Sequence, residues 1–208
     1  IDSLQVTLTD QELMKLYSIE LDNYSLKKVR DMFCFMCFTG QRISDLKKLS
    51  RSDIKTNENG NLVWVNHVQK TKEPLIIPLN RYAANILKKY QDDEKPIPIM
   101  SEQKANQYIK ELCSYAKIDE PIKFIQYKGS KQIEVIKPKY EMVANHTARR
   151  TFVTLSLEKG MRPETIMKIT GHKDLKVFQK YIKITSKVVE NELHRYWDEP
   201  QKVLQERM

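Results

Sequence analysis

Apolar side chains recur three or four positions apart along most of this chain, which is the spacing of an amphipathic helix. One such run extends from Leu26 to Met36 and predicts a helix that ends near Gly40. Thr9 and Glu12 have the spacing of a capping box and open a helix that extends to about Ile19. Further helices are predicted at about residues 42–49, 80–90, 101–116, 148–160, 163–171, 174–181 and 189–197.

Two shorter stretches predict antiparallel hairpins. The first pairs residues 62–67 with 75–79, follows a turn at Asn59-Gly60 and carries a basic tip at residues 70–72. The second pairs residues 124–127 with 132–137 around Lys128-Gly129-Ser130. We therefore expect a mainly α protein with a small antiparallel β-sheet at one side, an α+β architecture in one domain.

The charge of the chain indicates the class of its partner. It has 36 Lys and Arg against 27 Asp and Glu, a net charge of +9, and the excess is spread along all 208 residues. A basic surface on a folded body favours nucleic acid as the partner. Among phosphodiesters, DNA is the expected partner of such a surface.

The three cysteines predict reduced thiols in a cytoplasmic protein. Cys34 and Cys37 have the spacing of a metal pair, but they lie in the apolar run 32–38 with no second pair, so we interpret them as core residues. That run is far shorter than the roughly 20 residues of a membrane span. We expect no membrane contact, no metal and no cofactor. The chain starts at Ile1 without Met, and we expect it to be a fragment whose natural N-terminal part has been removed.

Two arginines stand where an anion could bind. His146 and Arg149 are three residues apart at a predicted helix start, so they share one face beside free backbone amides. Arg42 follows Thr39-Gly40 at a corner between two predicted helices, and a guanidinium there can grip two phosphate oxygens. Taken alone, neither pattern requires a function. HxxR is a common accidental pattern, and an arginine just past a helix end is often a solvated surface residue.

Lys70, His172 and Tyr181 complete the set of residues with suitable chemistry. Lys70 lies at the hairpin tip, although charge alone does not separate it from Lys72. His172 follows Gly171 at a break between two helices, and Tyr181 comes nine residues later. A phenol has an ordinary pKa of about 10, so it needs nearby cations and a proton acceptor to act as a nucleophile. Nothing in the local sequence singles out Tyr181 among the ten tyrosines.

The order of these motifs resembles the tyrosine recombinase (phage integrase) family, and the resemblance covers nearly the whole chain. The matching pieces are Thr39 to Leu46, Lys70 with the downstream Ile77-Pro78-Leu79, His146 to Phe152, and Gly171 to Leu175 leading to Tyr181. The downstream Ile-Pro-Leu favours Lys70 over Lys72. The chain has Gln41 and Ala148 where the family often has Leu, and its segment 124–142 resembles an extra hairpin of integrases from conjugative and other mobile elements.

The resemblance implies the tyrosine recombinase catalytic-domain fold and a site-specific DNA recombinase activity. In that activity Tyr181 attacks a scissile phosphate and forms a 3′-phosphotyrosyl bond, without ATP or metal. The family implies roles for the other residues: Arg42 and Arg149 stabilise the phosphate charge, Lys70 protonates the leaving 5′-oxygen, His146 helps to accept the tyrosine proton, and His172 hydrogen-bonds to the phosphate. Asp45 is a weaker expectation, as a residue that orients its neighbours.

The resemblance also bears on domains and assembly. It implies that residues 1–208 are the catalytic domain, and that the family's N-terminal core-binding domain is absent from this chain. The C-terminal helix and tail at 185–208 are expected either to contact a neighbouring protomer or to pack on their own domain. We expect double-stranded DNA as the partner and a homo-oligomer, a tetramer, on that DNA, with the isolated domain monomeric in dilute solution. The expected location is cytoplasmic and nucleoid-associated.

Three rival functions remain at this point. A type IB topoisomerase-like nicking-closing enzyme would share the chemistry without exchanging strands, and a catalytically silent DNA-binding module would use only the basic surface. A metal-dependent relaxase also uses tyrosine, but it needs a close histidine cluster that the sequence lacks. The sequence does not decide the target site, the direction of reaction, the accessory proteins, or whether Tyr181 acts in its own subunit.

Overall fold

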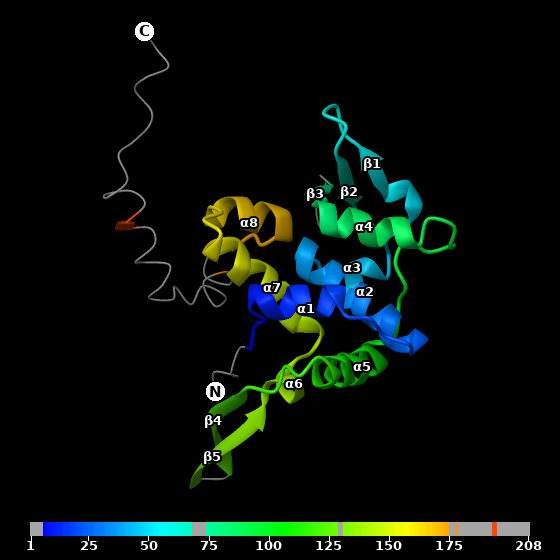
Figure 1. Cartoon of the computed structure of the whole chain (residues 1–208). Helices are drawn as coiled ribbons and strands as arrows, with labels where there is room; N and C mark the ends of the chain where they lie inside the picture. Colours follow the sequence, from blue (N-terminus) through cyan, green and yellow to red (C-terminus); the bar gives the residue numbers. More distant parts are fainter. Residues whose placement is uncertain (1–5, 68–73, 129–130, 175–177, 179–192, 195–208) are drawn as a thin grey trace.

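The computed structural model describes residues 6–67, 74–128, 131–174, 178 and 193–194. It confirms a mainly helical protein with small antiparallel sheets (Figure 1). The helices are α1 (Asp10–Ser18), α2 (Tyr24–Thr39), α3 (Ile43–Leu46), α4 (Arg81–Lys89), α5 (Glu102–Tyr115), α6 (Lys139–Met142), α7 (Asn145–Glu158) and α8 (Pro163–Thr170), with a 3₁₀ turn at Arg51–Asp53. The strands are β1 (Ile54–Thr56), β2 (Leu62–Asn66), β3 (Leu75–Pro78), β4 (Pro121–Lys128) and β5 (Lys131–Pro138).

The cap residues set the helix starts where the sequence predicted them. The Thr9 hydroxyl accepts the backbone N–H of Glu12 at 3.2 Å, and the Glu12 carboxylate accepts that of Thr9 at 2.7 Å, which completes the capping box of α1. The side chain of Asn80 accepts the backbone N–H groups of Tyr82 and Ala83 at the start of α4, and that of Ser101 accepts the N–H of Lys104 at the start of α5. The helix predicted at 42–49 is shorter than expected, because α3 ends at Leu46.

Helix α2 is the centre of the core. Its second half, from Met32 to Thr39, is buried on every side, and the helix packs against α1, α4, α5 and α7. Cys34 and Cys37 lie in this segment with Cys113 of α5 beside them, so their interpretation as core residues is confirmed. Burial raises the pKa of the Cys113 thiol to about 12, which leaves it protonated and unreactive near neutral pH.

The strands form two separate sheets rather than one. Strand β2 pairs with β1 and β3 in a three-stranded antiparallel sheet, and β1 was not predicted from the sequence. Trp64 and Ile77 turn from this sheet into the core, where they are almost completely buried. Strands β4 and β5 pair only with each other, as a long hairpin that extends from the body of the molecule (Figure 1).

A buried ion pair joins the base of that hairpin to α1. Lys139 follows β5 directly and is 5% exposed, and its Nζ lies 2.7 Å from Oε2 of Glu12. The same carboxylate oxygen also completes the cap of α1, so one acid serves two segments that are far apart in the sequence. None of the helices in the described part of the chain is long and apolar enough to span a membrane.

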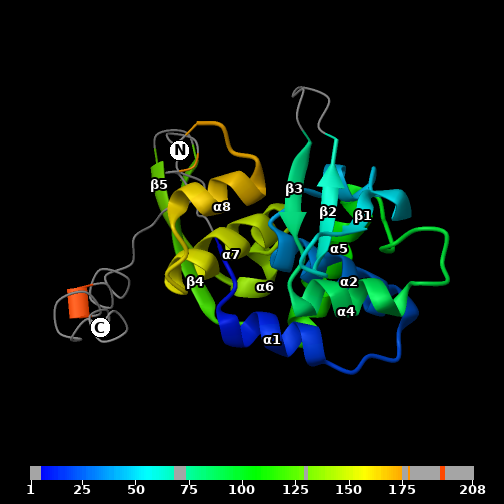
Figure 2. The same ribbon diagram turned by 90° about the horizontal axis from the view of Figure 1, so that it is seen from above.

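Helices α7 and α8 lie next to each other at one side of α2 (Figure 2). Between them is a small apolar cluster around Val153, Ile166 and Phe178. Helix α8 also packs against β3. This arrangement brings the start of α7, the end of α8 and the corner between α2 and α3 into one region of the molecule.

Candidate functional site

Three of the predicted residues line one pocket. Its volume is about 150 Å³, and Arg42, His146 and Arg149 are all part of its wall. Arg42 caps the start of α3, whereas His146 and Arg149 come from the first two turns of α7. The three-residue spacing of His146 and Arg149 therefore does place both on one face, as the sequence suggested.

Arg149 is held firmly although its charge is buried. The residue is 2% exposed, and its Nη1 donates a hydrogen bond to the carbonyl of Gly40 at 2.9 Å. Its Nη2 lies 3.0 Å from Nε2 and 3.2 Å from Nδ1 of His172. A buried cation with these fixed partners cannot relax toward water, so its field is available for an anion that enters the pocket.

His172 reaches Arg149 because of a left-handed glycine. Helix α8 ends at Thr170, and Gly171 adopts φ 71°, a conformation that L residues rarely take. The backbone N–H of His172 then donates to the carbonyl of Met167 at 3.0 Å, which closes the helix end. The imidazole lies edge-on to Phe178, with their ring centroids 5.2 Å apart.

The environment of His172 keeps its imidazole neutral near pH 7. Burial, followed by the positive charges of Arg149 and Arg42, lowers its pKa from 6.5 to about 4. Arg42 and Arg149 both line the small pocket, so their guanidinium groups act on the same volume. The positive charge of the site then comes from two guanidinium groups and from the N-terminal amides of α7.

The corner that carries Arg42 is tied to α8 by a residue that sequence reasoning missed. Gln41 is 1% exposed, and its Nε2 donates to the carbonyls of Thr39 and Ile169, both at 2.9 Å. The sequence marked Gln41 only as a departure from the family pattern. The one available signal in the sequence was an amide side chain next to a motif arginine, at a position where the family often has Leu. Arg42 itself is exposed, and its backbone N–H donates to the Asp45 carboxylate at 3.1 Å.

Two asparagines build the wall of the pocket beside His146, which is exposed. The side-chain oxygen of Asn106, on α5, accepts the backbone N–H of Asn145 at 2.8 Å. The side-chain amide of Asn145 donates to the carbonyl of Glu102 at 3.3 Å. These bonds fix the start of α7 against α5, and so fix the direction of the α7 N-terminal amides.

Two predicted residues lie outside the described residues. These are Lys70, on the connection between β2 and β3, and Tyr181, which follows Phe178. The C-terminal segment 185–208 lies outside them as well, apart from residues 193–194. Within the described part of the chain, no three His, Cys, Asp or Glu side chains are grouped closely enough to hold a metal ion.

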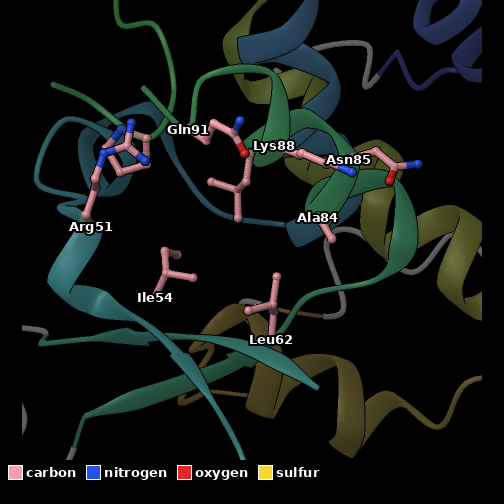
Figure 3. A pocket seen from close by; sticks show the side chains of 9 residues that line it. Arg51, Ile54, Leu62, Ala84, Asn85, Lys88 and Gln91 are labelled. Carbon is pink, nitrogen blue, oxygen red and sulfur yellow. The ribbon is translucent and has the colours of Figure 1, made fainter. Parts of the chain in front are cut away.

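A larger pocket lies elsewhere, between the β1–β2 strands and α4 (Figure 3). Its volume is about 520 Å³, with Ile54, Leu62 and Leu87 among its apolar walls and Lys88 at its edge. The guanidinium of Arg51 in this pocket already donates to the carbonyl of Asp93 at 2.9 Å. None of the predicted site residues lines it, so we assign the chemistry to the smaller pocket.

Comparison with known proteins matches this arrangement to one family. The chain is 28% identical to the tyrosine recombinase XerC of Chlamydia muridarum (strain MoPn / Nigg) over 185 residues, which cover 87% of this chain and 55% of the relative. The chain therefore spans about half the length of that curated relative.

Two solved structures show the same fold at lower identity. The crystal structure of XerA recombinase superposes with a TM-score of 0.66 at 17% identity, over 95% of this chain and 67% of that one. The Tn1549 transposon integrase, in complex with circular intermediate DNA, superposes with a TM-score of 0.61 at 19% identity, over 93% of this chain and 68% of that one. The model of the phage integrase family matches residues 7–187, and the chain belongs to that family.

Proposed function

We propose that this chain is the catalytic domain of a site-specific DNA recombinase that cuts and rejoins DNA through a tyrosine. The observation that carries the proposal is the joint lining of one small pocket by Arg42, His146 and Arg149, with His172 against Arg149. Membership of the phage integrase family supports it. So does the Tn1549 integrase, a structural neighbour that was solved with DNA.

The two arginines supply the charge that the reaction needs. A phosphodiester under attack gathers negative charge on its non-bridging oxygens, and fixed guanidinium groups stabilise that charge without reorganisation. The hydrogen bond from Arg149 to the Gly40 carbonyl holds one guanidinium in place at 2.9 Å. Asp45 positions the other arginine through its bond to the Arg42 backbone.

The remaining residues supply the nucleophile, the proton transfers and a further hydrogen bond to the phosphate. The Tyr181 oxygen forms a bond to phosphorus while the bond from phosphorus to the 5′-oxygen breaks, which leaves a 3′-phosphotyrosyl link. His146 helps to accept the phenol proton, Lys70 protonates the departing 5′-oxygen, and His172 hydrogen-bonds to the phosphate. The link conserves the energy of the broken bond, so rejoining needs no ATP, and the arginines take the charge-stabilising role that a metal would have.

The proposal extends to the whole protein. Residues 1–208 are its catalytic domain, and a core-binding domain completes its grip on double-stranded DNA. The protein acts as a tetramer on DNA, in the cytoplasm and on the nucleoid, with segment 185–208 contacting a neighbouring protomer. Sizing the chain on DNA with and without the residues after Lys187 tests that contact. An unchanged assembly after truncation would show that the segment packs on its own domain.

A trapping experiment tests the chemistry without knowledge of the target sequence. The chain is mixed with a library of nicked duplexes that have randomised arms, in which cleavage releases a short strand and prevents rejoining. We expect the wild-type chain to form covalent adducts that survive a denaturing gel and retain a label on the 5′ end of the cleaved strand. Tyr181→Phe forms none, whereas Tyr115→Phe, at a surface tyrosine that is 59% exposed, forms as many as wild type.

The outcomes separate the rival functions. Adducts from Tyr181→Phe would remove that tyrosine from the site, and a wild-type chain that binds the library without adducts would be a DNA-binding module. Relaxation of supercoiled plasmid, without strand exchange between paired copies of the selected site, would indicate a topoisomerase-like enzyme. Adducts that require a divalent cation would contradict the metal-free mechanism.

A further inference from the structure

The end of α8 contains a hydrogen-bond chain that no motif of the family accounts for. Thr170 is 1% exposed and immediately precedes Gly171. Its Oγ1 lies 2.7 Å from the carbonyl oxygen of Ile166, one turn back in the same helix. The same Oγ1 lies 2.7 Å from Nδ1 of His172. One buried hydroxyl therefore contacts both the helix backbone and the imidazole of the site.

The positions of the protons in this chain follow from the chemistry of its members. A carbonyl oxygen can only accept, so the single hydroxyl proton of Thr170 belongs on its bond to Ile166. If that proton pointed to His172 instead, two oxygens would face each other at 2.7 Å with no hydrogen between them. The hydroxyl must therefore accept from the imidazole, and Nδ1 of His172 carries a proton.

Arg149 is compatible with this assignment but does not choose the tautomer. Its Nη2 lies 3.0 Å from Nε2 and 3.2 Å from Nδ1 of His172, and a guanidinium can only donate, so either ring nitrogen could be its acceptor. Because Nδ1 donates its proton to Thr170, Nε2 is the nitrogen that accepts from Arg149. The lowered pKa of His172, from burial and from the charges of Arg149 and Arg42, agrees with a neutral ring.

We propose that Thr170 is a positioning residue, whose hydroxyl holds His172 as the Nδ1–H tautomer with Nε2 presented to Arg149, which lines the pocket. The single proton of the hydroxyl is already donated to Ile166, so Oγ1 can only accept from the ring. The bond to Nδ1 therefore does not depend on the charge of the imidazole. Oγ1 accepts from Nδ1–H whether the imidazole is neutral or protonated, so the ring need not turn when its charge changes.

The consequence for catalysis rests on the proposed function. A non-bridging phosphate oxygen can only accept, so Nε2 must gain a proton before it can hydrogen-bond to the DNA phosphate. The negative phosphate favours that protonation, because it offsets the field of the two arginines. His172 would thus change from an acceptor for Arg149 to a donor for phosphate. Because a protonated Nε2 and Nη2 of Arg149 are both donors, Nη2 would turn from Nε2 to a phosphate oxygen, while the bond to Thr170 keeps the ring in place. Preorganisation of this kind lowers the reorganisation needed in the transition state.

Ring ¹⁵N NMR tests the tautomer directly. The chain has four histidines, so a sample labelled only at histidine gives few signals, and the signal lost in His172→Gln is that of His172. At pH 7.5 we expect a protonated Nδ1 and an unprotonated Nε2 in wild type and in Thr170→Ser, which keeps the hydroxyl. Thr170→Val has the same shape without an acceptor, and we expect its signals to move toward the Nε2–H form.

The chain offers a matched control in Thr39. This residue also ends a helix, precedes a left-handed glycine and donates its hydroxyl to the carbonyl one turn back, at 2.7 Å from Phe35. Thr39→Val removes the same type of helix bond but no contact with a histidine, so the tautomer of His172 should stay as in wild type. An Nε2–H form in wild type, or an unchanged tautomer in Thr170→Val, would overturn the proposal.

A second measurement connects the tautomer to the reaction. On a substrate recovered from the nicked library, Thr170→Val should cleave at least about tenfold more slowly in single turnover, since it removes the partner that orients a catalytic histidine. Thr170→Ser should restore the rate. If wild type forms no adduct, the proposed function fails while the NMR result stands. If cleavage occurs with Thr170→Val at the wild-type rate, the positioning role is wrong and the proposed function stands.

Discussion

Replacing Gly40 with alanine would strain the site, because neighbouring side chains fill the space around this glycine. Gly40 has φ 69°, and its carbonyl accepts the hydrogen bond from Arg149 Nη1. A Cβ atom there would lie 2.5 Å from Cδ1 of Phe152 and 2.9 Å from Cγ2 of Thr170. Neither atom is the free end of a long side chain, because Phe152 packs on the α7–α8 cluster and Thr170 is buried. Position 40 therefore requires glycine for two reasons: its backbone is left-handed, and there is no space for a Cβ atom.

The two costs have different sizes. A left-handed conformation costs a residue with a Cβ about 1–2 kcal/mol relative to glycine. Forcing a methyl group into a well-packed contact adds about 1–3 kcal/mol. We therefore expect Gly40→Ala to lower the free energy of unfolding by about 2–5 kcal/mol. The carbonyl that holds Arg149 must move as the backbone shifts, so adduct formation on the nicked library should fall as well.

Gly60 supplies the control for this prediction. It has φ 78°, but a Cβ there would meet no atom within 4 Å, so Gly60→Ala carries the conformational cost alone. Urea unfolding, followed through the fluorescence of the buried Trp64, measures both variants. Gly40→Ala should be the less stable of the two by about 1–3 kcal/mol, at an unchanged dependence on urea. Equal midpoints for the two variants would refute the argument from packing.

Two further predictions concern the charges of the site. Arg42→Ala and Arg149→Ala should each reduce adduct formation by about 10²–10³-fold, as loss of an oxyanion donor does, while Arg81→Ala on the exposed side of α4 should not; near-normal cleavage would remove that arginine from the site. His172 has a folded pKa of about 4, below its ordinary 6.5, so the unfolded chain binds more protons between these values and stability falls as pH drops through that window. From pH 7 to pH 5, wild type should lose about 1 kcal/mol more than His172→Gln in urea unfolding, after allowance for partial exposure of the ring; equal losses would contradict the lowered pKa.

The sequence by itself determined the features that depend on near neighbours. The capping residues Thr9, Asn80 and Ser101 mark helix starts because their side chains bond to amides two or three positions away. The glycines at 40 and 171 mark helix ends because only glycine enters the left-handed region at little cost. Apolar spacing predicted that α2 is a helix of the core, and the order of the motifs indicated the family.

The tertiary structure decided which of these separate pieces meet. The bond from Arg149 to the Gly40 carbonyl joins residues 109 positions apart, and the bond from Gln41 to Ile169 joins residues 128 apart. Strand β1 has only three residues, too few for a recognisable pattern, and it forms where β2 offers it an edge. The burial of Arg149 depends equally on how α7 and α8 pack. No local pattern encodes such contacts, because their free energy comes from surfaces that become neighbours only when the whole chain has folded.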